Sequence, residues 1–130
     1  YNYDIPVPDA EPYRLVLTAL QASKKVLAGI PWRTVSGNDA GAYTKEYLAA
    51  LSPMEGVRAQ VRPWLQDFTA SWVKGHINYG PGEIRAQIQA VYDAGYEEWI
   101  LWNASNHYTE DALLPAEDSK EGQKEEGTGR

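Results

Sequence analysis

The apolar residues between Pro12 and Gly29 recur every three or four positions. This spacing predicts a helix with one face buried in a core. Pro12 suits the first turn of such a helix, and Gly29 is placed to end it. The expected buried face consists of Tyr13, Val16, Leu17, Leu20 and Leu27. We interpret this stripe as core packing.

From about residue 58 to residue 68 the pattern changes to a period of two, which predicts a strand. One side carries Val61, Pro63 and Leu65, and the other carries Arg62, Trp64 and Gln66. Pro63 counts against a central strand, because proline cannot donate a ladder hydrogen bond. Asp67 follows at the point where the strand should end.

The side with Arg62, Trp64 and Gln66 is too polar for a plain core and too aromatic for a plain solvent face. A carboxylate such as Asp67 beside an indole and an amide is typical of a sugar subsite. The alternative is an exposed edge strand that is capped by a turn aspartate. Both interpretations stay open on these residues alone.

A second helix is predicted over Glu83–Ala94, followed by a short apolar strand at Trp99–Trp102 that ends in Asn103. Strand, helix and strand in this order predict a right-handed βαβ unit with parallel strands. Asn103 and Asp67 should therefore lie at the same sheet edge. Ligands bind at the carboxyl edge of parallel α/β folds.

The remaining segments lack a long apolar period. We expect an extended lead-in over 1–11, and a loop, a short helix and a loop over 30–60. The segment 69–82 should be a loop that builds the active face in a barrel. A last helix is expected over 109–114, and 115–130 should be a disordered charged tail because it is rich in Glu, Lys, Gly and Ser.

Composition fits one domain or a part of one: the 130 residues are 43% hydrophobic and include five Trp and nine Tyr, enough for a packed core. A net charge of −6 argues against a nucleic-acid partner. No apolar run approaches the roughly 18 residues of a membrane span. The chain begins with Tyr1 rather than Met, which leads us to expect a processed piece or a fragment.

Cysteine is absent, which excludes disulfides and thiolate metal sites but does not decide the compartment. We favour an extracellular or cell-envelope location. His76 has no second histidine at ligand spacing, since His107 is remote in the sequence. We therefore expect neither a metal site nor a cofactor.

Four motifs of the chain recur together in a known family. They are Arg62-Pro63-Trp64-Leu65-Gln66-Asp67-Phe68-Thr69, Arg85-Ala86-Gln87-Ile88, Asp93-Ala94-Gly95 and Trp99-Ile100-Leu101-Trp102-Asn103. With them the chain resembles a bacterial family of proposed glycoside hydrolases, over roughly residues 1 to 114. That family is known mainly as a domain of unknown function with an expected (β/α)8 barrel fold.

The resemblance implies an α/β fold in which residues 1–114 are the carboxyl-terminal part of a (β/α)8 TIM barrel. They would supply its last two strands and their helices. A whole barrel needs eight strands and about 250 residues. The chain would then be incomplete on its own and would need the upstream part of the barrel as a partner.

The resemblance also implies a glycoside hydrolase that acts on a poly- or oligosaccharide. Hydrolysis usually needs two carboxyl groups, about 5 to 10 Å apart. Asp67 is the candidate for one of them, and the other would lie upstream. Arg62, Gln66 and Asn103 are candidates for binding sugar hydroxyls, and Trp64, Trp72 and Trp102 for stacking on sugar faces.

Each of these residues has a structural alternative. The tryptophans can be core residues, which is our interpretation of Trp99, and Arg62 can pair with a carboxylate inside the barrel. A second function is a non-catalytic carbohydrate-binding or cell-envelope protein on the same fold. A third is a small isolated α/β domain with a structural role.

Overall fold

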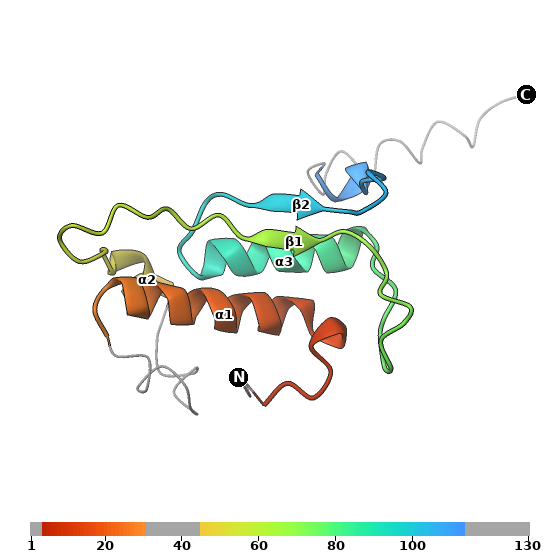
Figure 1. Cartoon of the computed structure of the whole chain (residues 1–130), viewed down its shortest axis with the longest axis horizontal. Helices are drawn as coiled ribbons and strands as arrows, with labels where there is room; N and C mark the ends of the chain where they lie inside the picture. The colour runs from red at the N-terminus through yellow and green to blue at the C-terminus, as the bar shows by residue number, and fades with distance from the viewer. Residues whose placement is uncertain (1–3, 31–44, 114–130) are drawn as a thin grey trace, which may run out of the picture.

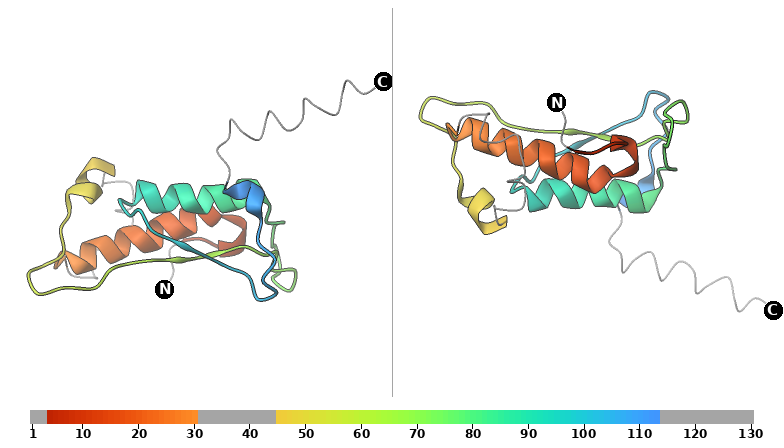
Figure 2. Two further views of the ribbon diagram at one scale, coloured as in Figure 1. Left: turned by 90° about the horizontal axis from the view of Figure 1, so that it is seen from above. Right: turned by 90° about the horizontal axis from the view of Figure 1, so that it is seen from below.

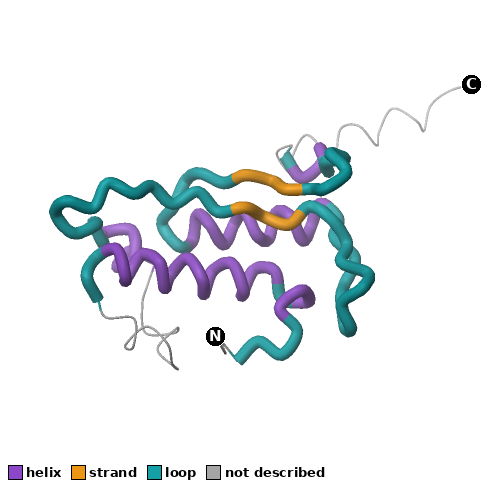
Figure 3. Tube along the Cα trace, viewed as in Figure 1, coloured by secondary structure: helices purple, strands orange, loops and turns teal. Residues whose placement is uncertain are grey.

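A computed structural model of the chain describes residues 4–30 and 45–113. Figures 1 and 3 show the longer helices side by side, with the short strands running along them. The segment 31–44 and the tail expected to be disordered, 115–130, lie outside the described residues. In chain order the elements are the 3-10 turn η1 (Pro8–Ala10), α1 (Pro12–Leu27), α2 (Lys45–Ala50), β1 (Trp64–Gln66), α3 (Pro81–Asp93), β2 (Ile100–Trp102) and the 3-10 turn η4 (Glu110–Ala112).

The helices α1 and α3 lie where the apolar spacing predicts them, and both end at a glycine. At the end of α3 the N–H of Gly95 donates to the carbonyl of Tyr92 at 2.9 Å, and the N–H of Tyr96 donates to that of Val91 at 3.1 Å. This pairing needs a left-handed residue after the helix, and Gly95 has a φ of +82°. Gly29, with a φ of +83°, ends α1 in the same way.

The core lies between the two helices and one face of the sheet. Its buried residues are Leu20, Leu65, Ile84, Ile88, Val91, Ala94 and Ala112. Trp99 packs against this cluster, which confirms its interpretation as a core residue. Tyr13 was expected in the core but is 38% exposed. Its hydroxyl instead donates to Asp93 at 2.8 Å and thereby links the start of α1 to the end of α3.

The two strands pair in parallel, which confirms the predicted βαβ connection through α3. The register aligns Trp64 with Ile100 and Gln66 with Trp102. Strand β1 has three residues, whereas the period of two predicted a strand from 58 to 68. Pairing begins at Pro63, whose carbonyl accepts from Ile100 at 2.9 Å. The ladder cannot extend further back through this residue, because proline has no N–H to donate.

The two faces of this sheet differ in how they are covered. Leu65 is buried against the helices, at 1% exposure. Trp64, Ile100 and Trp102 lie on the opposite face and are 66%, 37% and 40% exposed. The views in Figure 2 show α1 and α3 packed together on one side of the strands. Among the described residues, no helix covers the face with the tryptophans.

Two shorter segments differ from the sequence prediction. The lead-in before residue 12 is not simply extended, because residues 8–10 form the turn η1 and Asp9 is buried there. The helix expected over 109–114 is a single 3-10 turn, η4, which places Ala112 in the core. The short helix expected before β1 is present as α2, with Leu48 fully buried.

Candidate functional site

The carboxyl ends of β1 and β2 lie side by side, and Asp67 and Asn103 follow them directly. The side-chain amide of Asn103 donates a hydrogen bond to the backbone carbonyl of Asp67. The N–H of Asp67 donates to the carbonyl of Trp102 at 3.1 Å. The predicted placement of Asp67 and Asn103 at one sheet edge is therefore confirmed.

The carboxylate of Asp67 is buried, with the residue 3% exposed. One of its oxygens accepts from the backbone N–H of Thr109 at 2.8 Å, and the other accepts from the Thr109 hydroxyl at 2.7 Å. Both oxygens thus bind a residue 42 positions further along the chain. Asp67 links the end of β1 to the start of η4.

The side chain of Gln66 is also bonded within the protein. Its amide nitrogen donates to the carboxylate of Asp9 at 2.8 Å and to the carbonyl of Phe68 at 2.9 Å. Sequence analysis placed this amide among the groups that bind sugar hydroxyls. In the structure its two N–H groups hold η1 and the turn after β1 in place.

The aromatic residues at this edge meet around Phe68. The ring of Phe68 stacks on that of Trp72, with centroids 5.9 Å apart and an angle of 15° between the planes. Trp102 meets the same ring edge-on at 5.5 Å and 76°. A hollow of about 230 Å³ opens beside them, lined by Trp64, Leu65, Gln66, Phe68 and Trp102. We call this hollow the aromatic groove.

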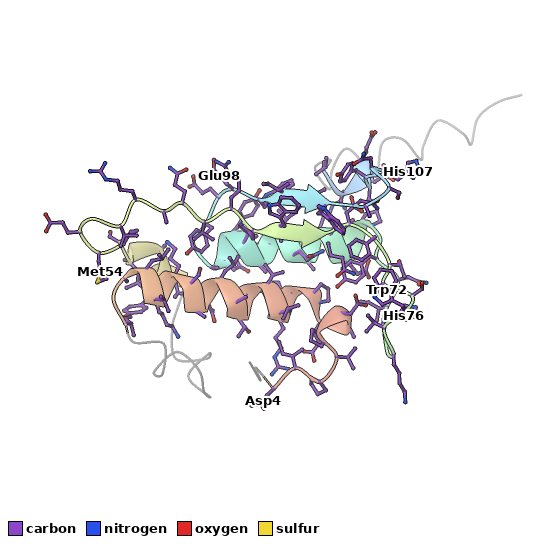
Figure 4. The ribbon with its side chains drawn as sticks, in the orientation of Figure 1. Asp4, Met54, Trp72, His76, Glu98 and His107 are labelled. Carbon is purple, nitrogen blue, oxygen red and sulfur yellow. The ribbon has the colours of Figure 1, made fainter. Side chains whose placement is uncertain are left out.

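Trp72 extends from the loop after β1 and is 76% exposed. Figure 4 shows it together with His76 and His107 toward the carboxyl ends of the strands. The structure therefore brings together the three tryptophans predicted for stacking: Trp64 and Trp102 in the groove, and Trp72 beside it. All three present ring surface to solvent.

Arg62 lies apart from this group, because it precedes β1. Its guanidinium donates to Glu98 at 3.0 and 3.2 Å. Figure 4 shows Glu98 toward the amino ends of the strands, on the side opposite Trp72. Both side chains of the pair are about half exposed, at 49% and 54%.

The loop between β1 and α3 is anchored by Asp9 and Tyr79. The N–H of Ile77 donates to the Asp9 carboxylate at 3.2 Å, and the hydroxyl of Tyr79 donates to the Asp9 backbone carbonyl at 2.8 Å. Burial raises the pKa of Tyr79 to about 12, and the negative charges of Asp9 and Glu83 add to this rise. Tyr79 is therefore uncharged near neutral pH and can donate this hydrogen bond.

A larger hollow, of about 320 Å³, lies at the other end of the sheet. Its polar lining includes Lys24, Tyr96 and Glu98. The ammonium of Lys24 lies 4.9 Å from the centre of the Tyr96 ring. We place the candidate site at the aromatic groove instead, because parallel α/β folds bind ligands at the carboxyl ends of their strands.

Three residues that organise this edge were not predicted as site residues: Asp9, Phe68 and Thr109. Asp9 and Thr109 reach their partners through tertiary contacts across 57 and 42 residues, and no periodic pattern marks such contacts. Phe68 carried a weak signal, as the single phenylalanine of the chain directly after the predicted strand.

Within residues 4–30 and 45–113, no cluster of three or more His, Asp or Glu side chains is arranged to hold a metal ion. In the same part of the chain, no helix has the length and apolar character needed to cross a membrane.

Comparison with known proteins bears on the resemblance seen in the sequence. A family model described as a putative glycosyl hydrolase domain matches residues 1–108. Neither the curated proteins nor the solved structures contain a match to this chain. The family match spans β1, α3 and β2, and with them the aromatic groove and the Asp67–Asn103 edge. The chain therefore belongs to the putative glycosyl hydrolase domain family.

Proposed function

We propose that this chain supplies part of the active site of a glycoside hydrolase that cleaves a poly- or oligosaccharide. The observation that carries the proposal is the position of the aromatic groove. It runs along β1 and reaches Phe68 and Trp102 at the carboxyl ends of the two parallel strands, where α/β enzymes bind their substrates. Membership of the putative glycosyl hydrolase domain family supports the reaction class.

The groove has the chemistry that a sugar ring requires. Trp64 and Trp102 line it, and Trp72 lies next to it against Phe68. Exposed indole rings stack on the C–H faces of sugars and bury apolar surface as they do so. The polar residue directly after Trp102 is Asn103, whose side chain bonds to the Asp67 carbonyl and to Ser105 and so shapes this edge from within.

The uncovered face of the sheet supports a larger fold around these strands. We propose that β1 and β2 are the last two strands of a (β/α)8 barrel formed by residues 1–114 and an upstream part. In such a barrel one face of each strand packs on the outer helices, and the other face points to the interior. The exposures of Leu65 and Trp64, 1% and 66%, support this proposal.

Asp67 is the carboxylate at this edge, and we propose that hydrolysis depends on it. The sequence predicted Asp67 as a nucleophile or general acid/base, but Thr109 bonds to both of its oxygens in this structure, which favours an indirect role. Carboxylates that react directly would come from the upstream part of the barrel, with about 5 to 10 Å between the two carboxyl groups.

The test of this function is a hydrolysis assay of the full-length protein on glucans, chitin-type and peptidoglycan-type substrates. We expect cleavage of one of these classes. Trp102→Ala should lower kcat/KM by at least about tenfold, because it removes a stacking surface. Ile100→Ala is the matched control, since Ile100 lies on the same strand and the same face but does not line the groove.

Binding without cleavage would favour the other function, a non-catalytic carbohydrate-binding or cell-envelope protein. The aromatic groove serves both functions equally well. Equal losses of kcat/KM in Trp102→Ala and Ile100→Ala would count against the groove as the sugar site.

A further inference from the structure

The carboxylate of Asp67 is placed to fix a neighbouring loop. The residue is 3% exposed, and its two oxygens accept the N–H and the hydroxyl of Thr109 at 2.8 and 2.7 Å. A nucleophile or general acid/base must reach the reacting atom within hydrogen-bonding distance. A carboxylate with both oxygens bonded to one threonine is poorly placed to do so.

Asp67 also accepts a hydrogen bond from Asn103, at the start of the segment that leads to Thr109. The side chain of Asn103 donates to the backbone carbonyl of Asp67. The amide oxygen of Asn103 accepts from the N–H and the hydroxyl of Ser105, at 2.8 and 2.7 Å. The N–H of Asn106 then donates to the Asn103 carbonyl at 3.1 Å. Residues 104–108, which we call the edge loop, are thus closed onto Asp67 from both sides.

The edge loop presents polar and aromatic side chains to solvent. All of its residues are exposed, including His107 and Tyr108. Asn106 has a φ of +56°, a left-handed conformation that asparagine tolerates better than most residues. Figure 4 shows His107 at the same end of the strands as Trp72. The loop therefore presents an imidazole and a phenol to solvent at the carboxyl ends of the strands, and the Tyr108 hydroxyl lies 3.5 Å from the side-chain oxygen of Asn106.

We propose that Asp67 is a positioning residue that acts through Thr109, and that His107 and Tyr108 of the edge loop contact the sugar. The proposal rests on the proposed function, because it names the substrate contacts of the same site. Imidazole and phenol groups form hydrogen bonds with sugar hydroxyls. Their position is fixed by the loop, so release of the loop should impair catalysis without removing a reacting group.

Two substitutions of Asp67 separate positioning from direct catalysis. In Asp67→Asn the amide oxygen can accept the Thr109 N–H, and the amide nitrogen can donate to the Thr109 hydroxyl. This variant loses the charge and keeps the link. Asp67→Ala loses both hydrogen bonds. Thr109→Val removes the hydroxyl at nearly constant shape, and Glu110→Gln removes an exposed charge from the adjacent residue as a matched control.

The first measurement is hydrogen exchange of the backbone amides of Asn106 and Thr109, which requires no substrate. We expect Asp67→Ala and Thr109→Val to speed this exchange by about tenfold or more, because local opening becomes easier. Asp67→Asn and Glu110→Gln should stay within about threefold of wild type. Unchanged exchange in Asp67→Ala would overturn the positioning role.

The second measurement is hydrolysis by the full-length protein. We expect Asp67→Asn to keep more than about a tenth of the wild-type rate, with the same pH profile. Loss of a direct acid, base or nucleophile would cost at least about a hundredfold. A loss of that size in Asp67→Asn with normal exchange would show that Asp67 acts directly, and would overturn the proposal.

The third measurement concerns the sugar contacts. His107→Ala and Tyr108→Phe should raise KM by about threefold or more, with exchange of the Asn106 amide unchanged. Unchanged KM in both variants would overturn the assignment of the edge loop as a sugar contact. If the wild type cleaves no glycan while Asp67→Ala still releases the loop, the proposed function fails and the positioning role of Asp67 stands.

Discussion

The side chain of Gln87 in α3 pairs with the backbone of Gln66 in β1 as a neighbouring strand would. Its amide oxygen accepts the N–H of Gln66 at 2.9 Å, and its amide nitrogen donates to the Gln66 carbonyl at 2.8 Å. In the parallel register these two backbone groups point away from β2. Gln87, which is 3% exposed, therefore caps β1 on the side away from β2, directly before Asp67.

Substitution of Gln87 should destabilise the protein strongly. Gln87→Leu keeps the approximate size but leaves the N–H and the C=O of Gln66 without partners. We expect unfolding free energy to fall by about 2 kcal/mol or more, as for buried polar groups left unpaired. Denaturant unfolding measures this loss.

The control for this experiment is Gln89→Leu in the same helix. Gln89 is exposed and donates to Asp93 at 3.0 Å, four residues away. Its loss should change the unfolding free energy by no more than about 0.5 kcal/mol. Similar losses of unfolding free energy in Gln87→Leu and Gln89→Leu would show that the cap on Gln66 contributes little to stability.

Replacement of Phe68 should weaken sugar binding, although Phe68 is less exposed than the tryptophans around it. Phe68→Leu removes the ring that orients both Trp72 and Trp102. An aromatic pair is worth about 0.5–1.5 kcal/mol, so we expect affinity to fall by about three- to tenfold. Titration of tryptophan fluorescence with soluble oligosaccharides measures this change. Phe68→Tyr keeps the ring and should bind as the wild type does.

Arg62 should contribute little to substrate binding, although sequence analysis placed it in the site. Its partner Glu98 lies at the amino ends of the strands, away from the groove. We expect Arg62→Gln to leave KM within about twofold and stability within about 1 kcal/mol, as for a half-exposed ion pair. A KM increase of tenfold or more would return Arg62 to the site.

Stability should fall at high pH because of Tyr79. Burial raises its pKa from 10.0 to about 12, so the folded state binds this proton more tightly than the unfolded state. Its contribution is complete below about pH 10 and is lost as the pH rises toward 12. We expect a loss of about 1 kcal/mol, after allowance for solvent screening of a partly exposed group.

Comparison of Tyr79→Phe with wild type isolates this effect. The variant loses the hydrogen bond to Asp9 and should be less stable at about pH 9. Its stability should then depend less steeply on pH between about 10 and 12. An equal slope of stability against pH in Tyr79→Phe and wild type would show that Tyr79 does not cause the loss at high pH.

Much of the fold followed from local pattern. The apolar spacing located α1 and α3, and the glycines after them marked where they end. The order of strand, helix and strand predicted the parallel pairing, which places Asp67 and Asn103 together. The predicted length of β1 was too great, because a period of two marks where side chains alternate and not where backbone hydrogen bonds form. Pairing stops where the partner strand ends or where Pro63 has no N–H.

The roles of the polar residues could be predicted less well from the sequence. Gln66 and Asp67 have the side chains of a sugar site, and their types alone cannot show which groups they bond. In the structure Asp9, Thr109 and Gln87 bond to them or to their backbone. These partners come from the lead-in, from the segment after β2 and from α3, and only the packing of those segments brings them together.

The sequence by itself determined the helices, the parallel sheet and the edge at which polar and aromatic residues gather, because these depend on spacing along the chain. Tertiary structure decided which side chains at that edge are bonded inside the protein and which face solvent. The carboxylate of Asp67 is buried, while Trp64 and Trp72 are 66% and 76% exposed. The physical reason is hydrogen bonding. A buried polar group takes whatever partner the packed chain supplies, and that partner has no fixed distance along the sequence.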